Sequence, residues 1–259
     1  MKIRELNELL EQRYPSSLSC DWDNDGLLVS PDPDANVTGV LVSLDLLDAA
    51  IDEAVKRGCN VILTHHPLIF APLPSFTPEN GVSRRVLRLL SLGISTIACH
   101  TRADAAQGGV NDALSGLLGL SDVVPFADGL PRIGNLPAPL PVREAVDRIL
   151  AATGAKSALF SGRATTVFSV AVCGGAGKDY LAAASDAGAD LYLTGELSYH
   201  ARLDADDLPL LVCEVGHDVS ETEILNAFST FLAGAAPGIP VAVFPPCPGD
   251  GFSGGRLDI

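Results

Sequence analysis

The sequence lacks any hydrophobic run long enough to cross a membrane. No apolar stretch approaches the ~20 residues that a helix needs to span a bilayer, so a membrane protein is excluded. The segment from Met1 to Tyr14 places Ile3, Leu6 and Leu10 at helical spacing among charged residues, which indicates an amphipathic helix and not a signal peptide. We therefore expect a cytoplasmic protein.

Basic residues are also scarce. The chain has 17 Lys and Arg against 32 Asp and Glu, and its formal net charge of −15 repels phosphate backbones and anionic membranes. The charge therefore argues against nucleic acid as a partner, whereas bound divalent cations would offset some of the negative charge. The 259 residues are 47% hydrophobic and 19% charged, which is typical of a globular protein of one large domain or two ordinary ones.

The cysteines form no C-x-x-C pair. All six are far apart in the chain and several lie in apolar, strand-like runs, which argues against a disulfide framework or a cysteine zinc site. We interpret them as small buried hydrophobic residues in a reducing compartment.

Strand-like and helical patterns alternate along the chain. In the first half, strands are expected at 37–44, 60–63 and 94–99, with helices at 46–56 and 82–92 between them. The segment 125–141 contains five prolines and reads as a connector. After it we expect helices at 142–153 and 180–187 and strands at 167–173, 190–194 and 210–215.

This alternation predicts an α/β fold with two α/β domains built on mostly parallel sheets. We expect the second domain at 126–220 and the first at 1–125 plus 221–259, where a helix at 221–232 and a strand at 241–244 return to complete the first domain. The tail at 247–259, rich in Gly and Pro, is expected to be irregular.

All five histidines lie in four short polar clusters that follow apolar runs: His65 and His66, His100, His200, and His217. Each histidine could instead be an isolated core or surface residue. However, ligands of parallel α/β sheets bind beyond the carboxyl ends of the strands, where these clusters are expected. Imidazole and carboxylate bind borderline divalent metals, so the pattern indicates a metal site at the carboxyl ends of the strands.

The spacing selects a set of ligands. Adjacent His65 and His66 can each address a different metal, and His217 and Glu221 at i, i+4 share one helix face. Asp104 supplies a carboxylate short enough to bridge two cations. We therefore expect two divalent ions, whether Zn, Fe, Mn, Co or Ni, held by five side chains that leave positions open for water or substrate: His65, His66, Asp104, His217 and Glu221.

Other residues carry weaker signals. His100 and His200 are candidate catalytic residues that would orient substrate or carry protons. Asp23 and Asp45 are either carboxylates that orient ligand imidazoles or solvated loop acids. Trp22 is expected to be packed and not to stack on a base. The glycines at 174–177 fail the spacing of a Walker A loop and indicate a tight turn, with an anion site at the next helix as the alternative.

Several motifs together resemble the Nif-three-like dinuclear-metal-centre proteins, also called GTP cyclohydrolase 1 type 2 homologues. They are Trp22-Asp23-Asn24, Thr64-His65-His66-Pro67-Leu68-Ile69-Phe70, His100-Thr101-Arg102-Ala103-Asp104, Thr194-Gly195-Glu196 and Gly216-His217-Asp218-Val219-Ser220-Glu221. The resemblance covers about residues 1–235. It implies a two-domain subunit, a dinuclear site between the domains, a toroidal homohexamer, and the same five ligands.

Two functions remain open. In the first, the chain is a dinuclear-metal-dependent hydrolase that attacks a nucleotide or a phosphoester with metal-activated water. The family label would make the reaction the ring-opening of GTP. In the alternative, the chain is a non-enzymatic scaffold or regulator whose hexamer recruits partners. The open coordination positions favour the enzyme.

Overall fold

The computed structural model describes residues 1–246, which form two compact units. Unit 1 comprises Met1–Ala106 together with the returning segment Ile224–Pro246, and the described part of unit 2 is Gln107–Glu223. The expected tail at 247–259 lies outside the described residues.

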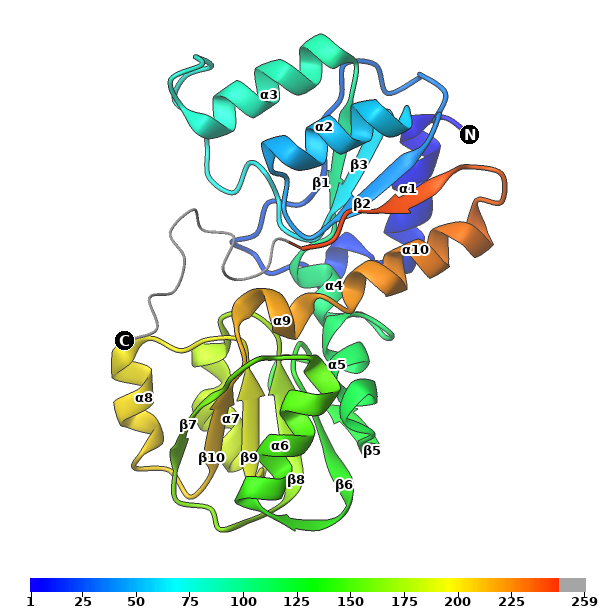
Figure 1. The fold of residues 1–259 in the computed structure, drawn as a ribbon. Coiled ribbons are helices and arrows are strands. Elements are labelled where there is room, and N and C mark those ends of the chain that lie inside the picture. The colour runs from blue at the N-terminus through cyan, green and yellow to red at the C-terminus, as the bar shows by residue number, and fades with distance from the viewer. Residues whose placement is uncertain (247–259) are drawn as a thin grey trace. The chain divides into compact units, whose positions relative to one another are not determined.

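Unit 1 is built on a five-stranded sheet in the order β1-β4-β3-β2-β11 (Figure 1). Three parallel strands form its centre and are buried along their whole length, which requires cover on both faces: β2 (Val40–Ser43), β3 (Val61–Thr64) and β4 (Ser95–Ala98). At the edges, β1 (Gly26–Val29) runs antiparallel to β4, and β11 (Val241–Val243) runs parallel to β2. The expected return of the C-terminal strand to the first sheet is confirmed.

Helices cover both faces of this sheet. Figure 1 shows α2 (Asp48–Arg57) and α3 (Gly81–Leu92) on one side, and α1 (Ile3–Arg13) and α10 (Ile224–Ala235) on the other. Asn80 begins α3 by accepting hydrogen bonds from the amides of residues 82 and 83, and Gly93 ends it at φ 70°, a left-handed conformation that favours glycine. The short α4 (Thr101–Ala105) follows β4, and a 3₁₀ turn, η1 (Ser16–Leu18), follows α1.

Unit 2 is built on a six-stranded sheet in the order β5-β6-β8-β9-β10-β7. Its parallel centre is β8 (Thr166–Cys173), β9 (Leu191–Thr194) and β10 (Leu211–Glu214). The flanking strands β5 (Ser121–Pro125), β6 (Arg132–Pro141) and β7 (Leu159–Gly162) pair antiparallel. The α/β fold with two sheets, whose central strands are parallel, is thus confirmed.

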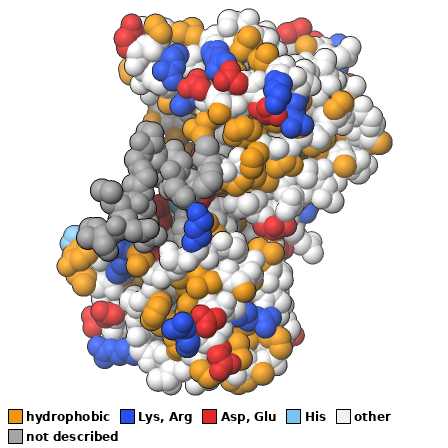
Figure 2. Space-filling model, viewed as in Figure 1, with side chains coloured by type: hydrophobic (Ala, Val, Ile, Leu, Met, Phe, Trp, Pro, Cys, Tyr) orange, Lys and Arg blue, Asp and Glu red, His pale blue; other side chains and the backbone are white. Residues whose placement is uncertain are grey.

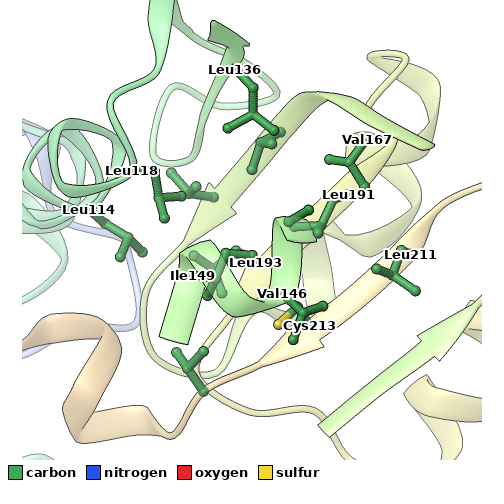
Figure 3. Close-up of a cluster of buried hydrophobic side chains, with 14 of the residues drawn as sticks. Leu114, Leu118, Leu136, Val146, Ile149, Val167, Leu191, Leu193, Leu211 and Cys213 are labelled. Atoms are coloured by element: carbon green, nitrogen blue, oxygen red, sulfur yellow. The ribbon is translucent and has the colours of Figure 1, made fainter. Parts of the chain in front are cut away.

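The core of unit 2 lies between this sheet and α5 (Val110–Leu118) and α6 (Val142–Thr153). Figure 3 shows Leu114 and Leu118 of α5 with Val146 and Ile149 of α6, facing apolar side chains of the strands. The remaining helical elements are η2 (Gly177–Tyr180), α7 (Leu181–Asp186), α8 (Tyr199–Ala205) and α9 (His217–Glu221).

The proline-rich connector is a wrong prediction. The segment 125–141 contains β6, a ten-residue strand within the second sheet. Pro137 and Pro139 are tolerated because they lie where the register between β6 and β8 shifts, between Asn135 and Leu140, so the ladder does not need their amides. The expected domain boundary at residue 125 would also separate β5 from β6, with which it pairs.

The distribution of charged side chains and the burial of the cysteines agree with what the composition predicts. On the face shown in Figure 2, basic side chains lie among acidic ones without gathering into a patch. Cys59, Cys99, Cys173 and Cys213 are buried, as expected of small hydrophobic residues, and burial raises the pKa of the Cys99 and Cys213 thiols to about 12. In the described residues, no helix is both long and apolar enough to span a bilayer.

Candidate metal centre

Three imidazoles meet at one edge of the sheet of unit 1. Strands β3 and β4 are parallel neighbours with Thr64 opposite Ala98, so the residues that follow them emerge side by side. The ring centroids of His65 and His66 are 4.9 Å apart, and His100 lies 5.3 Å from His65 and 5.6 Å from His66. One ring nitrogen of each of the three falls within 4.8 Å of the others.

Each of these imidazoles has its Nδ1 on a fixed acceptor. His65 Nδ1 lies 2.9 Å from the carbonyl oxygen of Cys99, His66 Nδ1 lies 2.9 Å from Asp45 Oδ1, and His100 Nδ1 lies 2.8 Å from Asp23 Oδ1. A carbonyl can only accept, so His65 Nδ1 carries the proton and Nε2 keeps the lone pair. The same tautomer follows wherever a carboxylate accepts from neutral imidazole, which is the usual arrangement around metal-binding histidines.

Asp104 joins this group from α4. Its Oδ1 lies 3.5 Å from His65 Nε2, and both side chains are buried. The helix begins directly after His100, shortly after β4, where the amides of Ala103 and Asp104 donate to the carbonyl of His100. The Nε2 atoms and a carboxylate oxygen thus approach one another in unit 1. That donor set suits a divalent cation with mixed nitrogen and oxygen ligands.

Unit 2 supplies a second donor pair. Strand β10 is followed by Gly216 and then by α9, so His217 and Glu221 share one face at i, i+4. His217 Nε2 lies 3.4 Å from Glu221 Oε2, and Glu221 is buried. His217 Nδ1 lies 3.0 Å from Glu196 Oε1, which repeats the pattern of unit 1. The residues present in both units fit a metal.

Sequence reasoning missed the glycines that make room for this pair. A Cβ atom on Gly175 would collide with the carboxylate of Glu221 and lie 3.3 Å from His217 Nε2. One on Gly195 would lie 2.6 Å from the carbonyl oxygen of Gly175 and 2.8 Å from His217 Cα. The signal was a glycine directly after a buried strand, which marks a close approach of backbones.

The glycine-rich turn after β8 is the tight turn that its spacing predicted. The amide of Gly175 donates to Ser220 Oγ at 3.0 Å, and that of Gly177 donates to Thr194 Oγ1 at 3.1 Å. A 3₁₀ turn, η2, follows it instead of a regular helix. These two amides are used inside unit 2, so the loop is not arranged as a phosphate cradle.

Buried charged side chains hold the first turn of α4 in place. Arg102 is buried, with its guanidinium 2.8 Å from Glu11, 2.7 Å from the carbonyl of Ala98 and 3.1 Å from Asp25. Burial raises the pKa of Asp25, although Arg102 opposes this. For Asp23, burial also opposes ionisation, but hydrogen bonds from His100 and Thr101 outweigh it and lower its pKa to about 2. Asp23 is therefore an ionised partner of His100.

His200 is placed differently from the other histidines. It is exposed on α8, and its ring lies 5.3 Å from that of Tyr199. In the described part of unit 2, no hydrogen bond or ion pair joins His200 to His217 or Glu221. Trp22 also departs from expectation, because its side chain is 62% exposed and not packed. The short loop around it is anchored through its polar neighbours instead.

Comparison with known proteins identifies the group to which this arrangement belongs. The model of the DUF34/NIF3 (NGG1p interacting factor 3) family matches residues 1–246. The chain belongs to this family. A NIF3 relative from Schizosaccharomyces pombe, described as a NIF3 homolog, is 34% identical, with 85% of each chain covered.

One bacterial relative is similar over more of the chain. A protein of Clostridium acetobutylicum named GTP cyclohydrolase 1 type 2 homolog is 30% identical over 91% of both chains. Among solved structures, a hypothetical protein of Staphylococcus aureus superposes with a TM-score of 0.86 at 26% identity, covering 94% of this chain and 96% of the other. The NIF3 fold and the resemblance drawn from the motifs are thus confirmed.

Proposed function

We propose that this chain is a hydrolase that depends on a dinuclear metal centre. Its ligands are the five side chains selected by spacing: His65, His66, Asp104, His217 and Glu221. The observation that supports this most directly is the shared orientation of the imidazoles, whose Nδ1 atoms all rest on acceptors: the Cys99 carbonyl for His65, Asp45 for His66, and Glu196 for His217. Structural core histidines have no reason to share one tautomer.

Neither donor set is sufficient for two ions by itself. Unit 1 offers His65, His66 and Asp104, and unit 2 offers His217 and Glu221, whereas two ions together need more protein donors than either unit provides. We propose that both sets are required, with positions left for water and substrate. Bound divalent ions supply Lewis acidity and lower the pKa of water.

His100 is the proposed proton carrier. Ionised Asp23 holds its Nδ1 at 2.8 Å, so the proton stays on Nδ1 and Nε2 is the basic atom. After taking a proton on Nε2, the imidazolium remains stabilised by the buried carboxylate, as expected of a general base that later acts as an acid. His200 stays a second candidate from the sequence.

The relatives' printed name points to a nucleotide as substrate, and we propose a nucleotide or a related phosphoester. The motif resemblance supports a homohexamer as the working form. The buried cysteines with raised pKa suit the reducing cytoplasm, which we propose as its location.

The experiment compares metal content and turnover in matched variants. Protein purified without chelator should hold about two divalent ions per chain, and Asp104→Ala and Glu221→Ala should lose metal together with all turnover of a nucleotide and phosphoester panel. His100→Ala should keep both ions and lose about 10²-fold in rate. The matched control is His200→Ala, expected to keep the ions because α8 carries no donor of either set.

Two outcomes would contradict the proposal. If Asp104→Ala retains both ions and full activity, the ligand set is wrong. If the ligand variants disrupt assembly or partner binding while no hydrolysis in the panel depends on metal, the chain is a scaffold instead.

A further inference from the structure

The loop between β9 and α8, residues 195–198, carries the carboxylate that faces His217. Glu196 Oε1 lies 3.0 Å from His217 Nδ1, yet the Glu196 side chain is 58% exposed. An exposed side chain gives up rotamer freedom to keep one partner, and water competes with it for that partner. Because packing does not hold Glu196 in place, its direction has to come from the backbone of the loop.

Hydrogen bonds fix that backbone on both sides of the Glu196 Cα atom. The amide of Glu196 donates to the carbonyl of Gly175 at 3.0 Å, and the amide of Leu197 donates to Glu214 Oε2 at 2.7 Å. The second bond is the shorter one, as expected when the acceptor is a carboxylate. One of the two anchors of Glu196 is therefore a side chain, which a substitution can remove.

Arg202 holds Glu214 in turn. Glu214 is the last residue of β10, and Arg202 lies in α8, which begins where the loop ends. Arg202 Nε lies 2.7 Å from Glu214 Oε1, and Arg202 Nη2 lies 2.7 Å from Glu214 Oε2. These two parallel bonds have the fork geometry in which arginine recognises a carboxylate, and they keep the carboxylate from rotating. Oε2 consequently stays directed at the amide of Leu197.

Fold stability does not account for a carboxylate at this position. Glu214 is buried, and the residues before it in β10, 211–213, are buried and apolar. Taking an ion pair out of water is costly, and an apolar side chain of similar volume often stabilises a fold as well or better. An apolar side chain cannot accept a hydrogen bond, however, and would leave the buried amide of Leu197 unpaired. The pair thus contributes a fixed direction for the loop.

We propose that Glu214 and Arg202 are positioning residues that hold Glu196 against His217. Fixing the amide of Leu197 fixes the peptide that follows Glu196, so the carboxylate meets Nδ1 of His217 and leaves Nε2 for a metal. That this matters for a metal rests on the proposed function, which takes His217 as a ligand. The affinity for metal then depends on two residues that touch no ion.

The alternative is that the pair only fastens α8 to the sheet. Losing either member would then lower stability without changing how a metal is bound. Asp190 supplies the matched control: it directly precedes β9, at the end of that strand opposite to the loop, and its carboxylate accepts from the amides of Phe168 and Ser169, both at 2.9 Å. Asp190→Ala should therefore destabilise the same sheet while leaving Glu196 in place.

The first measurement is metal affinity in the full-length protein, by competition against a metal-chelating dye. Glu214→Ala should weaken the binding of one ion by about 10-fold, within the usual effect of losing an outer carboxylate of a metal site. Arg202→Lys keeps the charge and loses the fork, so its effect should be smaller. Asp190→Ala should bind metal as the unaltered protein does, although urea unfolding should show that it and Glu214→Ala are both less stable. Unchanged affinity in Glu214→Ala would overturn the proposal.

A double-mutant cycle shows whether Glu214 acts through Glu196. Glu196→Ala removes the group that is positioned, so adding Glu214→Ala to it should weaken metal binding by less than about 2-fold more. Losses that multiply in the double variant would show that Glu214 affects the metal by another route, and they would overturn the proposal. Unaltered affinity in Glu196→Ala would do the same.

Nitrogen-15 NMR of the metal-free protein provides a measurement that needs no metal. At about pH 8, where imidazole is ordinarily neutral, the unaltered protein should carry the His217 proton on Nδ1, and Glu214→Ala should show both tautomers. A single tautomer in both proteins would overturn the positioning role. If the unaltered protein binds two ions yet hydrolyses nothing in the panel, the proposed function fails and the pair still positions His217. If it binds none, the tautomer spectra alone decide the role of the pair.

Discussion

Carboxylates lie within hydrogen-bond distance of the Nδ1 atoms of three histidines of the candidate site. Asp45 accepts from His66, Glu196 accepts from His217, and Asp23 accepts from His100. The sequence left Asp23 and Asp45 undecided between this role and solvated loop acids, because an acid that is distant in the chain gives no sign of which imidazole it meets. The five proposed ligands could be selected from the sequence because their spacing relates them to strand ends and to one helix face.

Removing Asp45 tests this positioning role. Asp45→Ala should weaken metal binding by about 10- to 100-fold, since the loss frees the His66 ring to rotate and lowers its basicity. The measurement is competition against a metal-chelating dye. Asp34→Ala is the control, because Asp34 is exposed and its carboxylate pairs with Arg4 near the N-terminus. Equal affinities in all three proteins would show that Asp45 does not orient a ligand.

The lowered pKa of Asp23 predicts a pH-dependent stability. Its value in the folded protein is about 2, below the ordinary value of 3.8, and its side chain is buried. The ionised carboxylate therefore stabilises the fold above pH 3.8, and this contribution is lost as the pH falls towards 2. Asp23→Asn should cost about 1–2 kcal/mol at pH 6 and less at pH 3, as measured by urea unfolding. A difference that stays constant between these pH values would count against the assignment.

At the scale of elements, the helices and parallel strands were the predictable part. The hydrophobic pattern placed α6 at its observed bounds and α3 within one residue of them. Both helices are amphipathic, so their apolar residues recur at helical spacing, and a glycine follows the last residue of each helix. The edge strands β1 and β7 were missed, and β6 was taken for a connector. Short edge strands have little periodicity, and the bulge that accommodates the prolines of β6 depends on its partner strand.

The position of α9, which carries His217 and Glu221, depends on the close packing of Gly195 against it. Gly195 has no room for a side chain, since a Cβ there would lie 2.7 Å from Ser220 Oγ and 2.8 Å from His217 Cα. Gly195→Ala should therefore displace α9 and remove metal without altering a ligand, while unfolding stays cooperative. The measurements are metal content and circular dichroism.

Gly234 offers the matched control for that variant. It lies in α10, where a Cβ would meet nothing within 4 Å. Gly234→Ala should keep all metal and leave stability unchanged or raised by up to about 1 kcal/mol. Full metal occupancy in both alanine variants would show that the close packing of Gly195 against α9 is not needed for metal binding.

At the scale of the whole molecule, the motif resemblance predicts assembly into a hexamer. The acidic chain repels copies of itself, so the contacts must be apolar and specific, and they should persist or tighten as salt screens the charge. Light scattering at micromolar concentration should give six times the chain mass of 26.9 kDa at both physiological and high salt. A monomer under these conditions would refute the prediction.

Because β11 pairs with β2, the two units can complete their folding at different times during synthesis. The described part of unit 2 is one continuous stretch, so this part can fold as soon as residue 223 has left the ribosome. Unit 1 must wait for β11, at residues 241–243, before its sheet is complete. Strand β2 thus presents an unpaired edge while the whole of unit 2 is being translated, a period in which newly made chains are vulnerable to aggregation. A nascent chain would accordingly hold His217 and Glu221 in place before His65 and Asp104, the reverse of their order in the sequence.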